Sequence, residues 1–275
     1  MNALRNNGLD GHSSGSYEPP PKRSRTATFQ PCKGDHCSLS CQIADILSVI
    51  EVMKVQQATT YKSFHYLEQT KVSAEDRKAL CQWGFDIMDA CKLNHDVAMI
   101  AIGYFDRFLS KRGLPVVEAC LDNQREFQLA FVTCLVLALK GRAGMGIEPK
   151  FVAEAMCEGM YLPEEIIALE IDILRTLGWR LNGPTASDFI KHFIELLPTG
   201  FDEEVASSLH DLACEKVKMG LLDYRLSLEL PSHLALASIS SLFQDINDEE
   251  QEKLGLSSWI SRISCLMATS GLGAL

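Results

Sequence analysis

The sequence predicts an all-α protein, built as two consecutive helical units behind a disordered tail. Leu, Ala, Ile, Glu and Met recur throughout the 275 residues while aromatic residues make up 8%, which is typical of helices rather than sheets. From about residue 42, apolar side chains recur with a period near 3.6 residues. No segment of four to eight residues alternates apolar and polar side chains as a half-buried strand would.

Residues 1–41 are predicted to form a disordered tail. They are rich in Gly, Ser, Pro and Asn and contain few large aliphatic side chains, so they cannot bury enough apolar surface to offset the entropy of folding. The tail holds PPPKRSR at residues 19–25, a basic cluster typical of a nuclear-import signal, with a solubilising tail as the alternative. We therefore expect the protein in the nucleus and the cytoplasm.

Four metal-ligand residue types lie close together at the end of the tail. These are Cys32, His36, Cys37 and Cys41. Their spacing contains no CxxC pair, so we expect scattered thiols and no metal site.

The first helical unit begins with two amphipathic segments. A helix from about residue 42 carries an apolar stripe, namely Ile43, Ile46, Ile50 and Met53. A second helix is predicted to start after Ser73, an N-cap with Asp76 in the capping-box position and Glu75 beside the positive helix end. Its stripe is Leu80, Trp83, Ile87 and Cys91.

Longer apolar segments follow. Residues 97–109 and 126–140 are apolar almost all round, so both are predicted to be buried central helices. Short helical pieces are expected at 149–158, and Pro163 opens a further helix with two glutamates in its first turn.

The pattern restarts after the sequence NGPT at residues 182–185. Helices are predicted at 186–196, 202–226, 232–244 and 247–270, separated by turn signals. We therefore divide the chain into the tail 1–41, a first unit 42–182 that includes the leading helix, and a second unit 183–275.

Charged residues within apolar helices are the candidates for function. Asp106 and Arg107 lie near the end of the 97–109 helix, and a buried ionised Asp106 requires a partner from elsewhere. Glu170 lies on a face with apolar neighbours, namely Ile166, Ile167, Ile173, Leu174 and Leu177. Lys140 is the first charge after the apolar run 127–139 and could also simply complement a helix C-terminus. A buried Glu170 needs a donor from this chain or from another.

Composition and motifs exclude several classes of function. The chain lacks HExxH and Walker sequences, so we expect no enzyme, no catalytic residue and no cofactor. Residues 42–275 hold 21 Lys or Arg against 33 Asp or Glu, which disfavours direct nucleic-acid binding. No apolar run reaches the length of a membrane span, and most of the ten cysteines lie singly in helical patterns. We expect a soluble intracellular interaction module with reduced thiols.

Four runs of sequence resemble the two cyclin boxes of the cyclins that activate cyclin-dependent kinases. They are DRKALCQWGFDIMDACKLNHDVAMIAIGYFDRFLS, FQLAFVTCLVLALK, ALEIDILRTLGWRLNGPT and LPSHLALASI. The resemblance covers roughly residues 42–270 and implies two tandem five-helix bundles preceded by an N-terminal helix. It suggests the cell-cycle type, either D-like or A/B-like.

The resemblance also implies roles for individual residues. Arg77 is expected to form a buried ion pair with Asp106. Lys140 and Glu170 match residues that bind main-chain groups of the kinase, so they should be satisfied by that partner rather than by this chain. The substrate-docking groove of the family is matched by four residues, namely Leu80, Trp83, Phe127 and Gln128.

The function implied is that of a regulatory subunit that binds and allosterically activates a cyclin-dependent serine/threonine kinase in cell-cycle control. Docking-peptide substrates or inhibitors are further partners implied by the groove, although Asp76 and Ala79 replace its usual methionine and isoleucine. The alternatives are a transcription-type cyclin, a cyclin-fold transcription factor or scaffold, and a helical enzyme whose site has no motif. An acidic folded part and the lack of a zinc ribbon disfavour the transcription factor.

Overall fold

The computed structural model describes residues 39–142, 144–198, 200–244 and 246–268. Within these ranges every regular element is helical, as the sequence predicted, and no strand is present. None of these helices is long and apolar enough to cross a membrane. The basic cluster at 19–25 and the tail cysteines before Cys41 lie outside the described residues.

The first bundle consists of five helices, with two short elements between the last two. The five are α2 (Ala74–Cys91), α3 (Asp96–Leu109), α4 (Pro115–Asp122), α5 (Gln124–Arg142) and α7 (Pro163–Thr176), and the short elements are α6 (Pro149–Phe151) and the π-helical turn η1 (Val152–Met156). Helices α3 and α5 form the most extensive helix contact in the structure. Eleven of the fourteen residues of α3 are buried, which confirms the prediction of a central helix that is apolar nearly all round.

The start of α2 follows the predicted capping chemistry. The Ser73 hydroxyl accepts a hydrogen bond from the Asp76 backbone N–H at 3.1 Å, and the Asp76 carboxylate accepts one from the Ser73 N–H at 2.9 Å. These reciprocal bonds satisfy donors at the helix N-terminus that have no partner within the helix.

Residues 116–126 contain most of α4, the third helix of this bundle. Helix α4 has Pro115 at its first position and buries Val117, Cys120 and Leu121. These side chains follow the i, i+3, i+4 spacing of a helical face and pack against α5. The run was too short for its periodicity to stand out from that of a connecting segment.

The second bundle also has five helices and one short turn. They are α8 (Ala186–Ile194), α9 (Glu203–Leu222), α11 (Pro231–Leu242), α12 (Asp248–Lys253) and α13 (Leu256–Ala268), with α10 (Tyr224–Ser227) following α9. Two predicted helices are therefore divided. Asp223 is extended and its carboxylate caps α10, accepting from the N–H groups of Arg225 and Leu226. Gly255, with φ +70°, separates α12 from α13.

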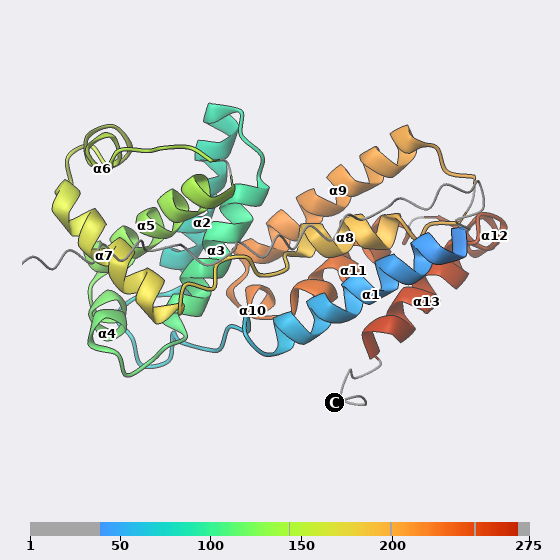
Figure 1. Cartoon of the computed structure of the whole chain (residues 1–275), viewed down its shortest axis with the longest axis horizontal. Helices are drawn as coiled ribbons and strands as arrows, with labels where there is room; N and C mark the ends of the chain where they lie inside the picture. The colour runs from blue at the N-terminus through green and yellow to red at the C-terminus, as the bar shows by residue number, and fades with distance from the viewer. Residues whose placement is uncertain (1–38, 143, 199, 245, 269–275) are drawn as a thin grey trace, which may run out of the picture. The chain divides into compact units, whose positions relative to one another are not determined.

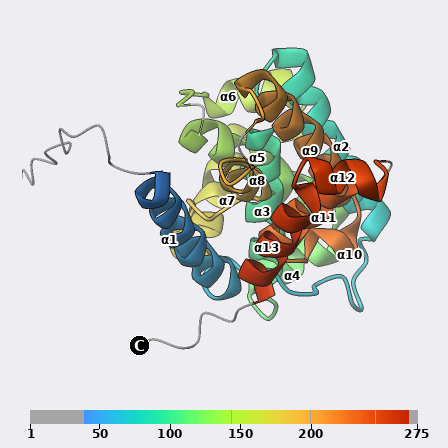
Figure 2. The same cartoon turned by 90° about the vertical axis from the view of Figure 1, so that its right-hand side faces the viewer.

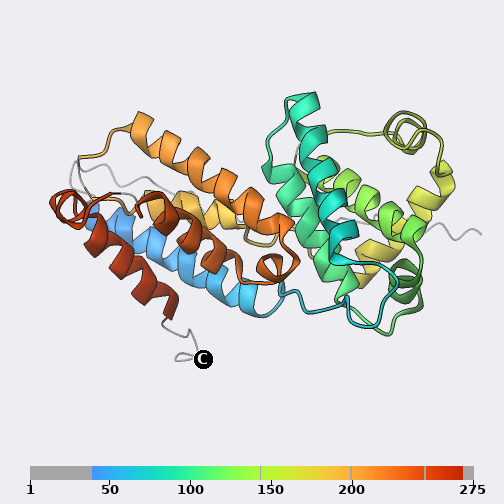
Figure 3. The same cartoon turned by 180° about the vertical axis from the view of Figure 1, so that it is seen from behind.

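Helix α1 (Leu39–Ala58) lies along the second bundle, although we grouped it with the first unit by sequence. Figures 1 and 3 show α1 beside α8, α11 and α13, and Figure 2 shows it at the edge of that bundle. The Gln57 amide donates to Ser232 Oγ at 2.7 Å and accepts from the Ser232 N–H at 3.0 Å. Lys54 Nζ donates to the Leu266 carbonyl. The leading helix therefore stabilises the second bundle directly.

Two helical glycines provide a matched test of the packing between α2 and α5. A Cβ atom at Gly84 would lie 2.9 Å from the Phe131 ring, whereas one at Gly103 would meet nothing within 4 Å. Phe131 is fully buried and cannot move freely. Gly84→Ala should therefore lower the free energy of unfolding by about 1 to 3 kcal/mol, while Gly103→Ala should raise it by about 0.5 to 1 kcal/mol.

Chemical denaturation of the two single variants measures both effects. Equal changes at the two glycines would contradict the close approach of α2 to Phe131.

Candidate functional site

Arg77 on α2 and Asp106 on α3 form a buried ion pair. The Arg77 Nε and Nη2 atoms donate to the two carboxylate oxygens of Asp106 at 2.8 and 2.7 Å. Arg77 is 0% exposed and Asp106 1%. A parallel pair of charge-assisted hydrogen bonds of this kind fixes both the distance and the orientation of the two groups.

The same pair also reaches the second bundle. Arg77 Nη1 donates to the Leu221 carbonyl, in the last turn of α9, at 2.9 Å. The Tyr66 hydroxyl donates to Asp106 Oδ1 at 2.7 Å. The Tyr224 hydroxyl accepts from the Tyr66 N–H at 2.8 Å. These contacts join α2, α3, the segment after α1 and the end of α9, so the pair connects the two bundles as well as two helices of the first.

Burial and charge keep these groups in one protonation state. Burial by itself would lower the pKa of Arg77, but the Asp106 carboxylate, together with Cys81 and Tyr66, raises the pKa well above its ordinary value. Burial and the Asp106 charge both raise the pKa of Tyr66. Burial also raises the pKa of the neighbouring Cys81 thiol to about 12. Arg77 therefore stays charged, and Tyr66 keeps its proton, at physiological pH.

Lys140 and Glu170 meet at the surface between α5 and α7. Lys140 Nζ donates to the two carboxylate oxygens of Glu170 at 2.7 and 2.8 Å. The Lys140 side chain is 32% exposed and that of Glu170 16%. Our expectation that neither residue has a partner within this chain was wrong, because the last turn of α5 and the middle of α7 bring them together.

Isoleucine side chains are exposed on the same stretch of α7. Ile167 and Ile171, one turn apart, are 43% and 39% exposed. Of the apolar face that we proposed for α7, all residues but Ile167 are buried, and Leu169 is buried as well. The buried members of the proposed face are Ile166, Ile173, Leu174 and Leu177. Exposed apolar residues beside a half-buried charge pair are typical of a protein–protein interface.

Trp179 is a further exposed side chain that the sequence analysis did not single out. It lies just after α7, is 69% exposed and has a positive φ of 59°. The backbone N–H of Trp179 donates to the Leu174 carbonyl at 2.9 Å. A non-glycine residue in this conformation is uncommon, and such residues cluster at functional sites. The signal available in the sequence was a tryptophan directly after the glycine that ends a helix.

The four residues of the expected docking groove lie on α2 and at the start of α5. Leu80, Trp83 and Gln128 are partly exposed, whereas Phe127 is 0% exposed. The Phe127 ring packs edge-on against Phe105 at a centroid distance of 4.9 Å. Phe127 therefore belongs to the core and does not offer surface to a peptide, contrary to our expectation.

The chain was compared with known proteins on the basis of its sequence. A family model described as "Cyclin, N-terminal domain" matches residues 48–182. The chain contains a cyclin N-terminal domain. Members of this family are regulatory subunits and not themselves enzymes. In the part of this cyclin that the structure describes, no group of three His, Cys, Asp or Glu could hold a metal ion.

Relatives occur among both A-type and D-type cyclins. Cyclin-A1-2 of Arabidopsis thaliana is 27% identical over 74% of this chain and 42% of its own length. G1/S-specific cyclin-D1 of Xenopus laevis is 26% identical over 72% of this chain and 65% of its own. The chain thus spans between about two fifths and two thirds of the length of these relatives.

A solved structure shares the fold. The viral cyclin from herpesvirus saimiri is 17% identical with a TM-score of 0.60, and the match covers 82% of this chain and 94% of the viral protein. The two five-helix bundles are therefore tandem cyclin boxes.

Removing one partner of the buried pair should be costly. Arg77→Met leaves the Asp106 carboxylate buried without its cation, so we expect a loss of about 3 to 5 kcal/mol in the free energy of unfolding. The double variant Arg77→Met/Asp106→Leu should lose much less than the sum of the two single losses, because no charge is left unpaired.

Chemical denaturation of the full chain measures these losses. Arg175→Met is the matched control, since Arg175 is 71% exposed and pairs with Asp172 on the surface. Strictly additive losses in the double variant would show that the pair is not coupled.

Proposed function

We propose that this cyclin binds a cyclin-dependent serine/threonine kinase and activates it allosterically in cell-cycle control. Family membership and the arrangement of α5 and α7 support the proposal. The observation that carries it is the half-buried Lys140–Glu170 pair beside exposed isoleucines. A bound partner would remove these exposed apolar side chains from water.

The pairing of Lys140 with Glu170 is compatible with kinase binding. An ammonium group has three donors, and two are used on the Glu170 oxygens. The third remains for a main-chain carbonyl of the kinase. The carboxylate accepts from Lys140 alone among the described residues and retains lone pairs for a main-chain N–H. The internal pair therefore orients both groups before the partner arrives, which lowers the entropy lost on binding.

The apolar side chains near the pair supply the rest of the interface. Ile167, Ile171 and Trp179 would be covered by the partner, and tryptophan is among the residue types that most often dominate binding energy. Phe151 on α6, which packs against α7, is 57% exposed and would extend this surface.

The mechanism is differential binding rather than catalysis by this chain. A rigid helical surface that binds the active arrangement of the kinase better than the inactive one shifts the population toward the active state. A change from about 1:99 to 99:1 requires roughly 5.5 kcal/mol of preference. A few central anchors of the kind formed here can provide that amount.

Two further proposals accompany this function. Leu80, Trp83 and Gln128 would offer a shallow docking surface to peptide substrates or inhibitors, without Phe127. The basic cluster at 19–25 would direct the protein to the nucleus, in addition to the cytoplasm.

Lys140→Ala and Glu170→Ala should abolish kinase activation while leaving the fold intact. Loss of a central charge-assisted anchor costs about 2 kcal/mol of binding, or roughly thirtyfold in affinity. The test is a pull-down of kinase from dividing-cell extract, followed by a histone phosphorylation assay and circular dichroism of each variant.

The matched control is Lys253→Ala/Glu249→Ala, which removes an exposed Lys–Glu pair on α12 in the second bundle. Folded wild-type protein that captures no kinase, or a control variant that loses activation as severely as the two test variants, would contradict the proposal.

A further inference from the structure

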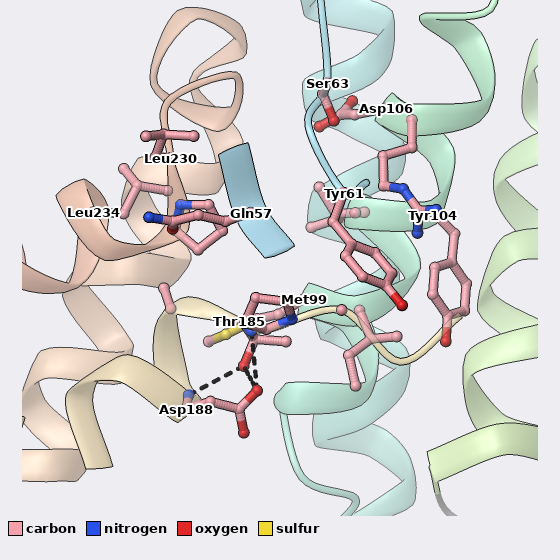
Figure 4. A pocket seen from close by; sticks show the side chains of 18 of the residues that line it. Gln57, Tyr61, Ser63, Met99, Tyr104, Asp106, Thr185, Asp188, Leu230 and Leu234 are labelled. Carbon is pink, nitrogen blue, oxygen red and sulfur yellow. Dashed lines mark hydrogen bonds between the residues drawn. The ribbon is translucent and has the colours of Figure 1, made fainter. Parts of the chain in front are cut away.

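A cleft of about 450 Å³ lies between the two bundles. Its walls come from the end of α1 and the segment after it, from α3, from the 181–185 linker and from the start of α11. Figure 4 shows Tyr61 and Tyr104 on one wall and Leu230 and Leu234 on the opposite one, with Thr185 and Asp188 below. The volume lies within the range of small-ligand sites.

Arg107 lines this cleft and is only 7% exposed, yet it has no carboxylate partner among the described residues. Its Nη2 donates to the Arg180 carbonyl at 2.8 Å, and its guanidinium stacks over the Tyr61 ring at 4.7 Å. Burial lowers the pKa of Arg107, and no neighbouring carboxylate opposes that shift. A largely buried cation without an anion is energetically unfavourable. Arg77 differs in this respect, because it is paired with Asp106.

The remaining donors of Arg107 face the cleft. Its Nε and Nη1 atoms form no hydrogen bond to the described part of the chain. In that part, every fully buried side-chain nitrogen or oxygen has a hydrogen-bond partner. These donors must therefore be accessible to solvent, and the cleft is the space that Arg107 lines.

Other donors converge on the same space. Neither the Tyr61 nor the Tyr104 hydroxyl forms a hydrogen bond to a described residue, and both side chains line the cleft. Burial raises the pKa of Tyr104 to about 12, while the charges of Arg107 and Arg142 both act to lower it. An oxyanion beside the Tyr104 hydroxyl would thus experience the positive charge of both arginines.

Arg142 is available to such a ligand. It is 55% exposed and lies 4.0 Å from Asp96 and 4.0 Å from Asp188, too far for a hydrogen bond to either. Asp188 is already used to cap α8 through Thr185. A doubly charged anion would compete with Asp96 and Asp188 for Arg142 more effectively than a singly charged anion would.

We propose that the cleft between the two cyclin boxes binds a phosphate monoester, held by Arg107, Arg142 and the Tyr104 hydroxyl. Two guanidinium groups match the charge of a phosphate dianion, and their N–H groups match its oxygens. The inference rests on the cleft alone and does not depend on kinase binding. The phosphate could come from a phosphorylated protein segment or from a small phosphorylated molecule, and the experiment separates these sources.

The test is thermal unfolding of the full chain in inorganic phosphate and in sodium chloride of equal ionic strength, with calorimetric titration of phosphate. We expect the melting temperature to rise by about 3 to 6 °C at ten times the dissociation constant. Tyr104→Phe, which removes a single hydroxyl, and Arg142→Gln should each weaken phosphate binding by about tenfold, because each removes a donor to a charged group.

Arg175→Gln is the matched control, since it removes an exposed arginine outside the cleft and should bind phosphate like the wild type. A phosphoserine peptide that binds tenfold more tightly than inorganic phosphate would identify a phosphorylated protein as the source, and equal affinity would identify a free phosphate. Three results would overturn the proposal: no stabilisation beyond that by chloride, equal stabilisation by acetate, or unchanged phosphate affinity in both Tyr104→Phe and Arg142→Gln.

Discussion

Arg77 donates to Asp106 on α3 and to the Leu221 carbonyl at the end of α9, and it is completely buried while doing so. A charge in this position is tolerated because each of its three nitrogens donates to an acceptor, and the geometry of those acceptors is fixed by helices of both bundles. Tyr66 and Tyr224 extend the network into the segment that connects α1 to α2. The arrangement of the two cyclin boxes, and hence every surface made by both, depends on this pair.

The three charged groups near the central helices illustrate three solutions to one problem. Arg77 and Asp106 neutralise each other in the core, and their role is structural. Lys140 and Glu170 neutralise each other at the surface, where exposed isoleucines lie beside them and a partner can still reach their spare donors and acceptors. Arg107, adjacent to Asp106 in sequence, has only an aromatic ring and one carbonyl as partners. Burial separates the structural pair from the surface pair. The lack of a carboxylate partner among the described residues marks Arg107 as a candidate for ligand binding.

Sequence reasoning predicted the helical class, the cap at Ser73 and the need of Asp106 for a partner, and the family resemblance named Arg77, whereas exposure was predicted less well. Periodicity shows which residues share a face of a helix, but not which of two adjacent apolar faces packs inward. For this reason Ile167 was placed on the packed face of its helix, although its side chain is 43% exposed. The contact of Lys140 with Glu170 depends on how α5 packs against α7, which no local pattern encodes. The position of α1 against the second bundle is likewise set by long-range contacts such as that of Gln57 with Ser232.

The most direct test of this account is hydrogen exchange on the full chain, comparing the wild type with Arg77→Met. If the buried pair joins the two boxes into one cooperative unit, amides of α3 and amides in the last turn of α9 should both lose protection, each by about a hundredfold or more. If α3 alone loses protection and the end of α9 keeps that of the wild type, the pair stabilises the first bundle only, and the two boxes are held together by other contacts.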